Sequence, residues 1–309
     1  MAPAFRPNRR TALALAGTAL LAPRGARAAA PALAPVAVME LDIAEAMLAL
    51  GVAPLAMAEA SRFRARFPGS RLPAACAELG ASWEPNLERL QELAPARVLA
   101  SRDREMLVPL LERVAPVTLI EPDDTRGRAA RGADLMRRLG DALGRAGEAQ
   151  AALAAAERQL ALLRGALAGR DLPPVFLVAL VEGGTHLEIY GAGCLLDDAL
   201  RRLGLANACA LPMPSYGWVI AGIEHLADRP EAAVLVLDFG APTRRALAQL
   251  HRSPLWRNLP PVAAGRLRLV EAASVWGGVP TLVDIAGRIA GVMAPSLAPA
   301  LYSPTGTRS

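Results

Sequence analysis

The stretch EAQAALAAAERQLALLRGALAG, Glu148–Gly169, decides how the chain is organised. Its apolar residues recur at every third or fourth position, which is the spacing of one stripe along an α-helix. The stripe consists of Ala149, Leu153, Ala156, Leu160, Leu163 and Leu167. A helix of this length extends for roughly 30 Å. The pattern predicts either a rigid strut between two lobes or a long helix packed inside one large domain.

On both sides of this helix, short Val/Leu-rich runs alternate with helical patterns. The predicted strands are 34–39, 54–58, 97–100 and 117–120 before it, and 175–181, 187–190, 234–238 and 266–270 after it. The predicted helices are 42–50, 85–93, 105–114 and 135–143 before it, and 194–203, 220–227, 243–250 and 280–293 after it, with 61–72 as a polar, arginine-rich loop. This alternation is typical of parallel sheets covered on both faces. The sequence therefore predicts an α/β fold with two Rossmann-like lobes joined by one long rigid helix.

The predicted lobes leave a leader and a tail at the two ends of the chain. The expected division is 1–28 as a signal peptide, 29–127 as the N-terminal lobe, 128–170 as connecting helices, 171–294 as the C-terminal lobe and 295–309 as a flexible tail. A cleft between two lobes is a preferred place for a ligand.

The first residues have the pattern of an export signal. Three arginines, Arg6, Arg9 and Arg10, precede the uncharged run 11–23, and Ala26-Arg27-Ala28 is a small-x-small cleavage pattern. The Arg9-Arg10 pair favours twin-arginine (Tat) export, with a general secretory signal as the alternative. Either route predicts a periplasmic protein.

The charge of the remaining chain excludes one class of partner. All 34 basic residues are arginine, five of them lie in the leader, and the other 29 equal the 29 acidic residues in number. A chain without a basic excess has no electrostatic footprint for nucleic acid.

The cysteines and histidines predict neither a resident metal nor an enzyme. Cys194 and Cys209 are either a disulfide, with Cys76 buried, or free thiols. There is no CxxC, and the three histidines are far apart in the sequence, so we expect no metal site and no cofactor. GxSxG and P-loop motifs are absent, and Gly191-Ala-Gly193 lacks the third glycine of a dinucleotide fingerprint. A nucleophilic pair of Cys194 with His186 is the remote alternative of a secreted α/β enzyme.

Four segments resemble one known family in order along the chain. They are VAVMELDIAEAMLALGVAPLAMAE (36–59), GASWEPNLERLQELAPARVLAS (80–101), YGAGCLLDDALRRLGLANA (190–208) and SPLWRNLPPVAAGRLRLVEAASVWGG (253–278). They are similar to the cluster A-III periplasmic substrate-binding proteins of ABC importers, in particular the ferric hydroxamate (ferrichrome-type) siderophore-binding proteins. The resemblance implies the class III periplasmic binding protein fold. It also implies capture of a ferric siderophore, whose iron is already coordinated, and its delivery by a monomer to a membrane permease.

The resemblance also implies roles for residues. One acidic residue per lobe, Glu88 and Glu224, would dock on permease arginines, unless both are ordinary surface charges. In the C-terminal lobe, Tyr216, Trp218 and Trp276 would line the cleft with aromatic rings, unless the tryptophans pack in the core. Trp256 is expected in the core.

The N-terminal lobe departs from the family pattern. Ser82, followed by Trp83, stands where hydroxamate binders have an arginine, and Arg104, with Arg102 nearby, stands where they have a tyrosine. Arginine suits anionic oxygens, so these two arginines are candidate replacements. The departure leaves cobalamin, haem or a carboxylate siderophore as alternative ligands. Arg62 and Phe63 are predicted rim contacts, unless their loop is merely solvated.

Overall fold

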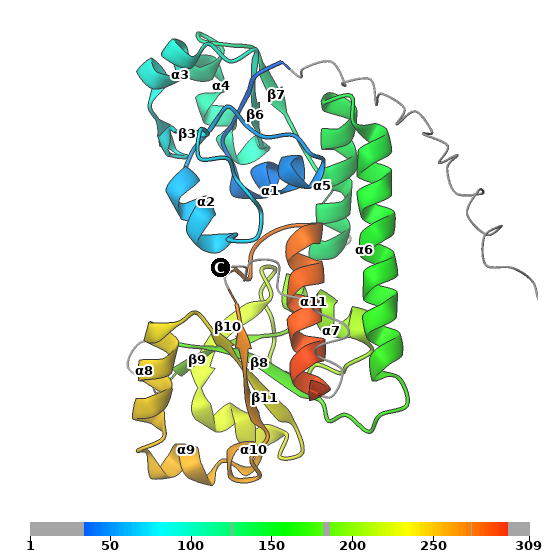
Figure 1. Ribbon diagram of the computed structural model, residues 1–309. Coiled ribbons are helices and arrows are strands. Elements are labelled where there is room, and N and C mark those ends of the chain that lie inside the picture. Colours follow the sequence, from blue (N-terminus) through cyan, green and yellow to red (C-terminus); the bar gives the residue numbers. More distant parts are fainter. Residues whose placement is uncertain (1–33, 124, 126, 182–185, 273, 296–309) are drawn as a thin grey trace, which may run out of the picture. The chain divides into compact units, whose positions relative to one another are not determined.

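The computed structural model describes residues 34–123, 125, 127–181, 186–272 and 274–295. The described residues from Ala34 onward belong to one compact unit that contains two five-stranded sheets (Figure 1). The predicted leader and all but the first residue of the predicted tail lie outside the described residues. None of the helices in the described part combines the length and apolar character needed to cross a bilayer.

The first sheet is parallel throughout. Its order is β3 (Ala77–Glu78), β2 (Ala56–Met57), β1 (Val36–Val38), β6 (Arg97–Ala100) and β7 (Val117–Leu119). Successive side chains alternate between faces, so Val36 and Val38 enter one core cluster while Ala37 and Met39 enter another. The first face is covered by α1 (Leu41–Ala49), α2 (Ala60–Arg66) and α5 (Arg128–Ala142). The second is covered by α3 (Leu87–Leu93), η1 (Arg102–Leu107) and α4 (Val108–Leu111).

The second sheet is mixed. Its order is β10 (Trp218–Gly222), β9 (His186–Tyr190), β8 (Val175–Leu180), β11 (Ala233–Asp238) and β12 (Leu267–Glu271). The last three strands are parallel to one another, whereas β9 and β10 are antiparallel to their neighbours. One face packs on α7 (Leu195–Leu203) and α11 (Val279–Met293). The other packs on η2 (Ile223–Asp228), α8 (Ala241–Leu250), α9 (Pro254–Asn258) and α10 (Pro260–Ala263). Trp256 is completely buried on this second face, as predicted.

The long helix α6 (Ala146–Leu167) carries the predicted stripe and shares it between two cores. Ala149, Leu153 and Ala156 pack in a cluster of the first sheet, whereas Leu160, Leu163 and Leu167 pack in a cluster of the second. The helix is not an isolated strut, because it packs along α5, α7 and α11 (Figure 1). Apolar contacts on these neighbours bury a face that a free strut would leave in water.

Three expectations about local structure are wrong. Segment 61–72 is not entirely loop, because Phe63 and Phe67, with ring centroids 4.8 Å apart, bury one side of α2. Segment 220–227 is not an α-helix but the end of β10 followed by η2. The second sheet is not wholly parallel. The last two differences have one cause. The antiparallel pairing of β10 with β9, which includes Trp218 opposite Tyr190, makes the start of segment 220–227 a strand and makes the sheet mixed.

The three cysteines are free thiols, which answers the question that the sequence left open. Cys76 and Cys194 are buried, and burial raises the pKa of each thiol to about 11. Both side chains are therefore protonated and unreactive at neutral pH.

Candidate ligand-binding site

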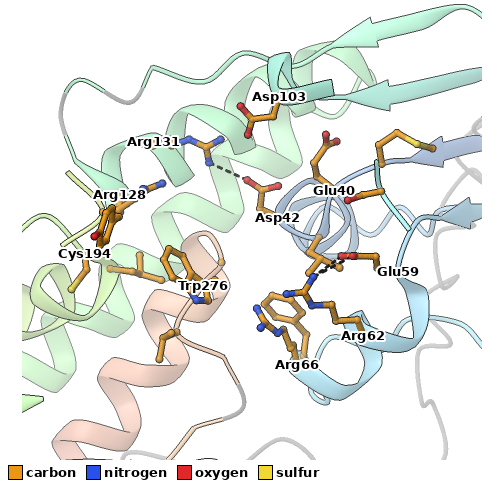
Figure 2. Close-up of a pocket in the computed structure, with 18 of the residues that line it drawn as sticks. Glu40, Asp42, Glu59, Arg62, Arg66, Asp103, Arg128, Arg131, Cys194 and Trp276 are labelled. Atoms are coloured by element: carbon orange, nitrogen blue, oxygen red, sulfur yellow. Dashed lines mark hydrogen bonds and ion pairs between the residues drawn. The ribbon is translucent and has the colours of Figure 1, made fainter. Parts of the chain in front are cut away.

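A pocket of about 430 Å³ is lined by segments from both sheets (Figure 2). Met39 and Glu40 follow β1, Arg104 lies beyond the end of β6, and Trp276 lies beyond the end of β12. Ligands of α/β proteins bind at the carboxyl ends of parallel strands, because the loops there are free to vary. This volume is in the usual range of small-molecule binding sites, which is about 300–1,000 Å³.

One wall of the pocket holds a buried polar network centred on Glu40. Its Oε1 accepts a hydrogen bond from Ser101 Oγ at 3.0 Å and lies 3.7 Å from Arg104 Nε. Arg104 Nη2 donates to Ser82 Oγ at 2.9 Å. Burial raises the pKa of the Glu40 carboxyl to about 7, although the bonds from Ser101 oppose the shift. Glu40 therefore changes charge near neutral pH within the pocket wall.

The network places Ser82 and Arg104 together, which the sequence predicted only as separate candidates. Ser82 is buried in the two-residue loop of the hairpin formed by β4 (Gly80–Ala81) and β5 (Glu84–Pro85). Arg104 follows β6 and reaches across to that loop. Arg104 thus presents its guanidinium at Ser82 in the pocket wall.

Two further ion pairs lie around the pocket. Arg62 Nη1 is 3.0 Å from Glu59 Oε2 within the first turn of α2, and Arg131 Nη1 is 3.0 Å from Asp42 Oδ2 between α5 and α1. Figure 2 shows both pairs at the pocket. They fix charged groups from three helices in place.

The opposite wall is aromatic. The rings of Tyr216 and Trp218 have centroids 5.2 Å apart and planes tilted by 55°. Gly217 between them has φ +80°, and a Cβ there would lie 2.4 Å from the backbone nitrogen of Cys194. Only glycine permits this close approach, which holds the aromatic pair against the first residues of α7.

Trp83 and Trp276 lie at the pocket with large exposed areas. Their side chains are 64% and 43% exposed respectively. Trp276 follows a turn in which its backbone N–H donates to Ser274 Oγ at 3.1 Å and its carbonyl accepts from the same hydroxyl at 2.6 Å. An exposed tryptophan held by its backbone is available to cover a flat ligand face.

The structure brings together most of the residues proposed from the sequence. The pocket is lined by Arg62, Ser82, Trp83, Arg104, Tyr216, Trp218 and Trp276. Phe63 is not at the rim, because it is completely buried in the core beneath α2. Arg102 does not line the pocket and instead pairs with Glu121 at 2.8 Å on the surface. Ligand contact by the seven pocket residues stays a prediction.

Glu88 and Glu224 are both exposed. Glu88 lies in the first turn of α3 and Glu224 in η2, so each sheet contributes one of them through a covering helix. Permease docking by these carboxylates stays a prediction.

The remote alternative of a Cys194–His186 pair finds no geometric basis. His186 begins β9, a strand that extends for roughly 13 Å, and Cys194 lies beyond its other end at the start of α7. Cys194 Sγ instead caps α7, accepting from Asp197 N–H at 3.4 Å and donating to the Gly191 carbonyl at 3.2 Å. Within the described residues, no group of three or more His, Cys, Asp or Glu side chains is placed to hold a metal ion.

The sequence interpretation missed several charged lining residues. They are Glu40, Asp42, Glu59, Arg66, Asp103, Arg128 and Arg131. Glu40 and Asp42 could have been predicted from the sequence, because they directly follow the predicted strand 34–39. Residues at the carboxyl end of a parallel strand lie at the edge of the sheet where ligands bind. Arg66 and Arg128 gave no such signal, since nothing local distinguishes them from solvated helix charges.

Comparison with known sequences identifies relatives of this chain. The sequence profile of the periplasmic binding protein family matches residues 36–273. The iron(3+)-hydroxamate-binding protein FhuD of Escherichia coli K12 is 27% identical over 233 residues, which is 75% of this chain and 78% of that protein.

Solved structures agree with the fold. FhuD from Vibrio cholerae bound to Fe3+-Desferal has a TM-score of 0.75 at 26% identity and covers 84% of this chain and 97% of its own. FeuA from Bacillus subtilis has a TM-score of 0.64 at 18% identity, over 84% of this chain and 93% of its own, a similarity that bears on the fold alone. The predicted class III architecture is confirmed.

Proposed function

The chain belongs to the periplasmic binding protein family, and on that basis we propose that it captures a ferric siderophore for import by an ABC transporter. The observation that carries the proposal is the pocket, with three tryptophans and two tyrosines around a polar wall. Similarity to two proteins named FhuD, one of them bound to Fe3+-Desferal, favours a hydroxamate-type chelate. The proposed activity is binding, not catalysis.

The pocket's residue types suit a chelate that carries its own iron ligands. Such a ligand needs no donor to the metal from the protein. It needs flat apolar contacts, which Trp83, Trp218 and Trp276 supply, and donors to its oxygens, which Arg104 and Ser82 supply. No cofactor has a role in this scheme.

Delivery and location complete the proposal. We place the protein in the periplasm as a monomer, exported by the twin-arginine machinery through residues 1–28. Glu88 and Glu224 are the carboxylates proposed to pair with arginines of the permease, since such pairs are directional and charge-assisted. Their exposure on the coverings of the two sheets supports this role.

The test is titration of the purified protein by intrinsic tryptophan fluorescence. The panel contains ferrichrome, a ferric tricatecholate, a ferric carboxylate siderophore, cobalamin and haemin. Saturable quenching by ferric chelates, with ferrichrome among them, is the expected result. A response to cobalamin or haemin alone would retain the fold and the transport role and overturn the siderophore.

A further inference from the structure

The pocket carries an excess of arginine. Its lining contains the five guanidinium groups of Arg62, Arg66, Arg104, Arg128 and Arg131, against the four carboxyl groups of Glu40, Asp42, Glu59 and Asp103. The chain beyond the predicted leader has no such excess, so the imbalance belongs to this site.

Three of the five arginines are paired and two are not. Arg62 pairs with Glu59, Arg131 with Asp42 and Arg104 with Glu40. Among the described residues, no hydrogen bond or ion pair reaches the guanidinium of Arg66 or Arg128. Both side chains belong to half-buried residues of the lining.

Arg66 and Arg128 come from different elements. Arg66 ends α2 and Arg128 begins α5. In the view of Figure 2 they lie on opposite sides of Trp276. Burial lowers the pKa of the Arg66 guanidinium, the positive charge of Arg62 lowers it further, and the negative charge of Glu59 opposes the shift as the smallest of the three effects. Arginine stays ionised under these conditions, so an anionic ligand group that pairs directly with Arg66 would offset the cost of its burial.

Other lining residues have unused hydrogen-bond donors. Arg104 Nε and Trp218 Nε1 are buried and have no hydrogen-bond partner, and the same holds for Glu40 Oε2. The two nitrogens donate only, so each can be satisfied only by an acceptor, and they outnumber the carboxyl oxygen. A ligand rich in anionic oxygen atoms fits this demand better than one with a cationic group.

The carboxyl groups do not cancel the excess. Within the described structure the Asp103 carboxylate has no ion-pair partner, but it is exposed at the rim, where water screens its charge. Glu40 is buried with a pKa of about 7 and is therefore partly neutral at physiological pH.

We propose that the preferred ligand is a ferric siderophore that bears free ionised carboxylate groups in addition to its iron-chelating groups, with Arg66 and Arg128 as the partners of those carboxylates. This inference rests on the proposed function and narrows its ligand class. Planar guanidinium groups bind carboxylates through two parallel hydrogen bonds, which gives direction as well as charge.

The test uses one ferric trihydroxamate core with three terminal groups. Ferrioxamine B ends in an ammonium group, its N-acetyl derivative is neutral, and its N-succinyl derivative ends in a carboxylate. We expect the succinyl form to bind about tenfold more tightly than the acetyl form, and the ammonium form to bind most weakly. Equal affinities, or a preference for ferrioxamine B, would overturn the inference and leave the proposed function standing. Failure of all three chelates to bind, while another ferric siderophore of the titration panel binds, would overturn the inference alone; failure of every ferric siderophore to bind would overturn both.

Two variants assign the preference to residues. In Arg66→Gln and Arg128→Gln, the ratio of succinyl to acetyl affinity should fall, and in the double variant it should approach one. Arg137→Gln removes an arginine from the exposed side of α5 and is the matched control. If the double variant keeps the full ratio, these arginines do not hold the carboxylate. Circular dichroism and melting temperature verify that each variant is folded.

Discussion

The carboxylate of Glu45 accepts a hydrogen bond from the hydroxyl of Thr281, with 2.6 Å between Glu45 Oε1 and Thr281 Oγ1. Glu45 Oε2 also accepts the backbone N–H of Gly278 at 2.7 Å. This contact joins α1, which covers the first sheet, to the start of α11, which covers the second. Burial raises the pKa of Glu45 to about 7, even though both hydrogen bonds lower it.

The first prediction concerns stability against pH. The folded protein binds a proton at Glu45 up to about pH 7, whereas the unfolded chain releases it near the ordinary value of 4.5. The contribution of Glu45 to the free energy of unfolding is therefore greatest below pH 4.5. It falls by roughly 3 kcal/mol as the pH rises from 4.5 to above about 7. Glu45→Gln, which stays neutral and can serve both partners, should be more stable than the wild type at pH 8 and similar at pH 5. Urea unfolding at both pH values measures this.

The same substitution at Glu112, which is exposed, is the control for loss of one negative charge. Glu40 shares the upward shift, so the wild type alone does not isolate Glu45. If the free energies of unfolding of the wild type and Glu45→Gln differed by the same amount at pH 5 and pH 8, the raised pKa would not belong to Glu45.

The second prediction separates a binding tryptophan from a core tryptophan. Trp276→Ala should weaken binding of a ferric siderophore about tenfold or more. It should change the free energy of unfolding by less than about 1 kcal/mol, because the side chain is half-exposed. Trp256→Ala removes a completely buried ring and should cost about 3–5 kcal/mol. Fluorescence titration and urea unfolding are the two measurements. Unchanged affinity in Trp276→Ala would remove that ring from the site.

The third prediction concerns the glycine between the aromatic rings. Gly217→Ala should destabilise the protein by about 3 kcal/mol or more, because it adds a clash with α7 to the strain of positive φ. Gly265→Ala has φ +66° and open space around the added carbon, so it should cost only about 1 kcal/mol. Equal costs would show that backbone strain alone acts at Gly217.

The fourth prediction tests delivery. Glu88→Ala and Glu224→Ala should leave siderophore affinity intact and abolish uptake of the iron-55 chelate by cells. Glu92→Ala lies on the same short helix as Glu88, where it pairs with Arg89, and should leave uptake unchanged. Normal uptake in both docking variants would make these carboxylates ordinary surface charges.

Buried runs made much of the fold predictable. The runs 97–100 and 234–238 are short and mostly apolar, which favours a strand buried on both faces, and both are strands of the structure. The stripe of α6 was equally clear because it repeats over about five helical turns. The packing of α6 was not predictable from the sequence, because an apolar stripe does not show whether its residues pack in one core cluster or in two.

The less predictable elements depend on partners distant in the sequence. β10 is a strand because β9 supplies hydrogen bonds to it, and its own apolar run fits a helix as well. In the site, the aromatic residues could be placed through resemblance to a family. The free arginines could not, because Arg66 and Arg128 differ from other helix arginines only in lacking a carboxylate neighbour within the described structure.

The division of α6 between two clusters limits where the chain can be cut. A fragment that ends before the helix leaves Ala149, Leu153 and Ala156 missing from the first core, and a fragment that begins after it deprives the second core of Leu160, Leu163 and Leu167. Neither half is therefore an autonomous folding unit. The described part of the chain should melt in one cooperative transition, and reconstitution from two pieces requires that one of them carry the whole helix.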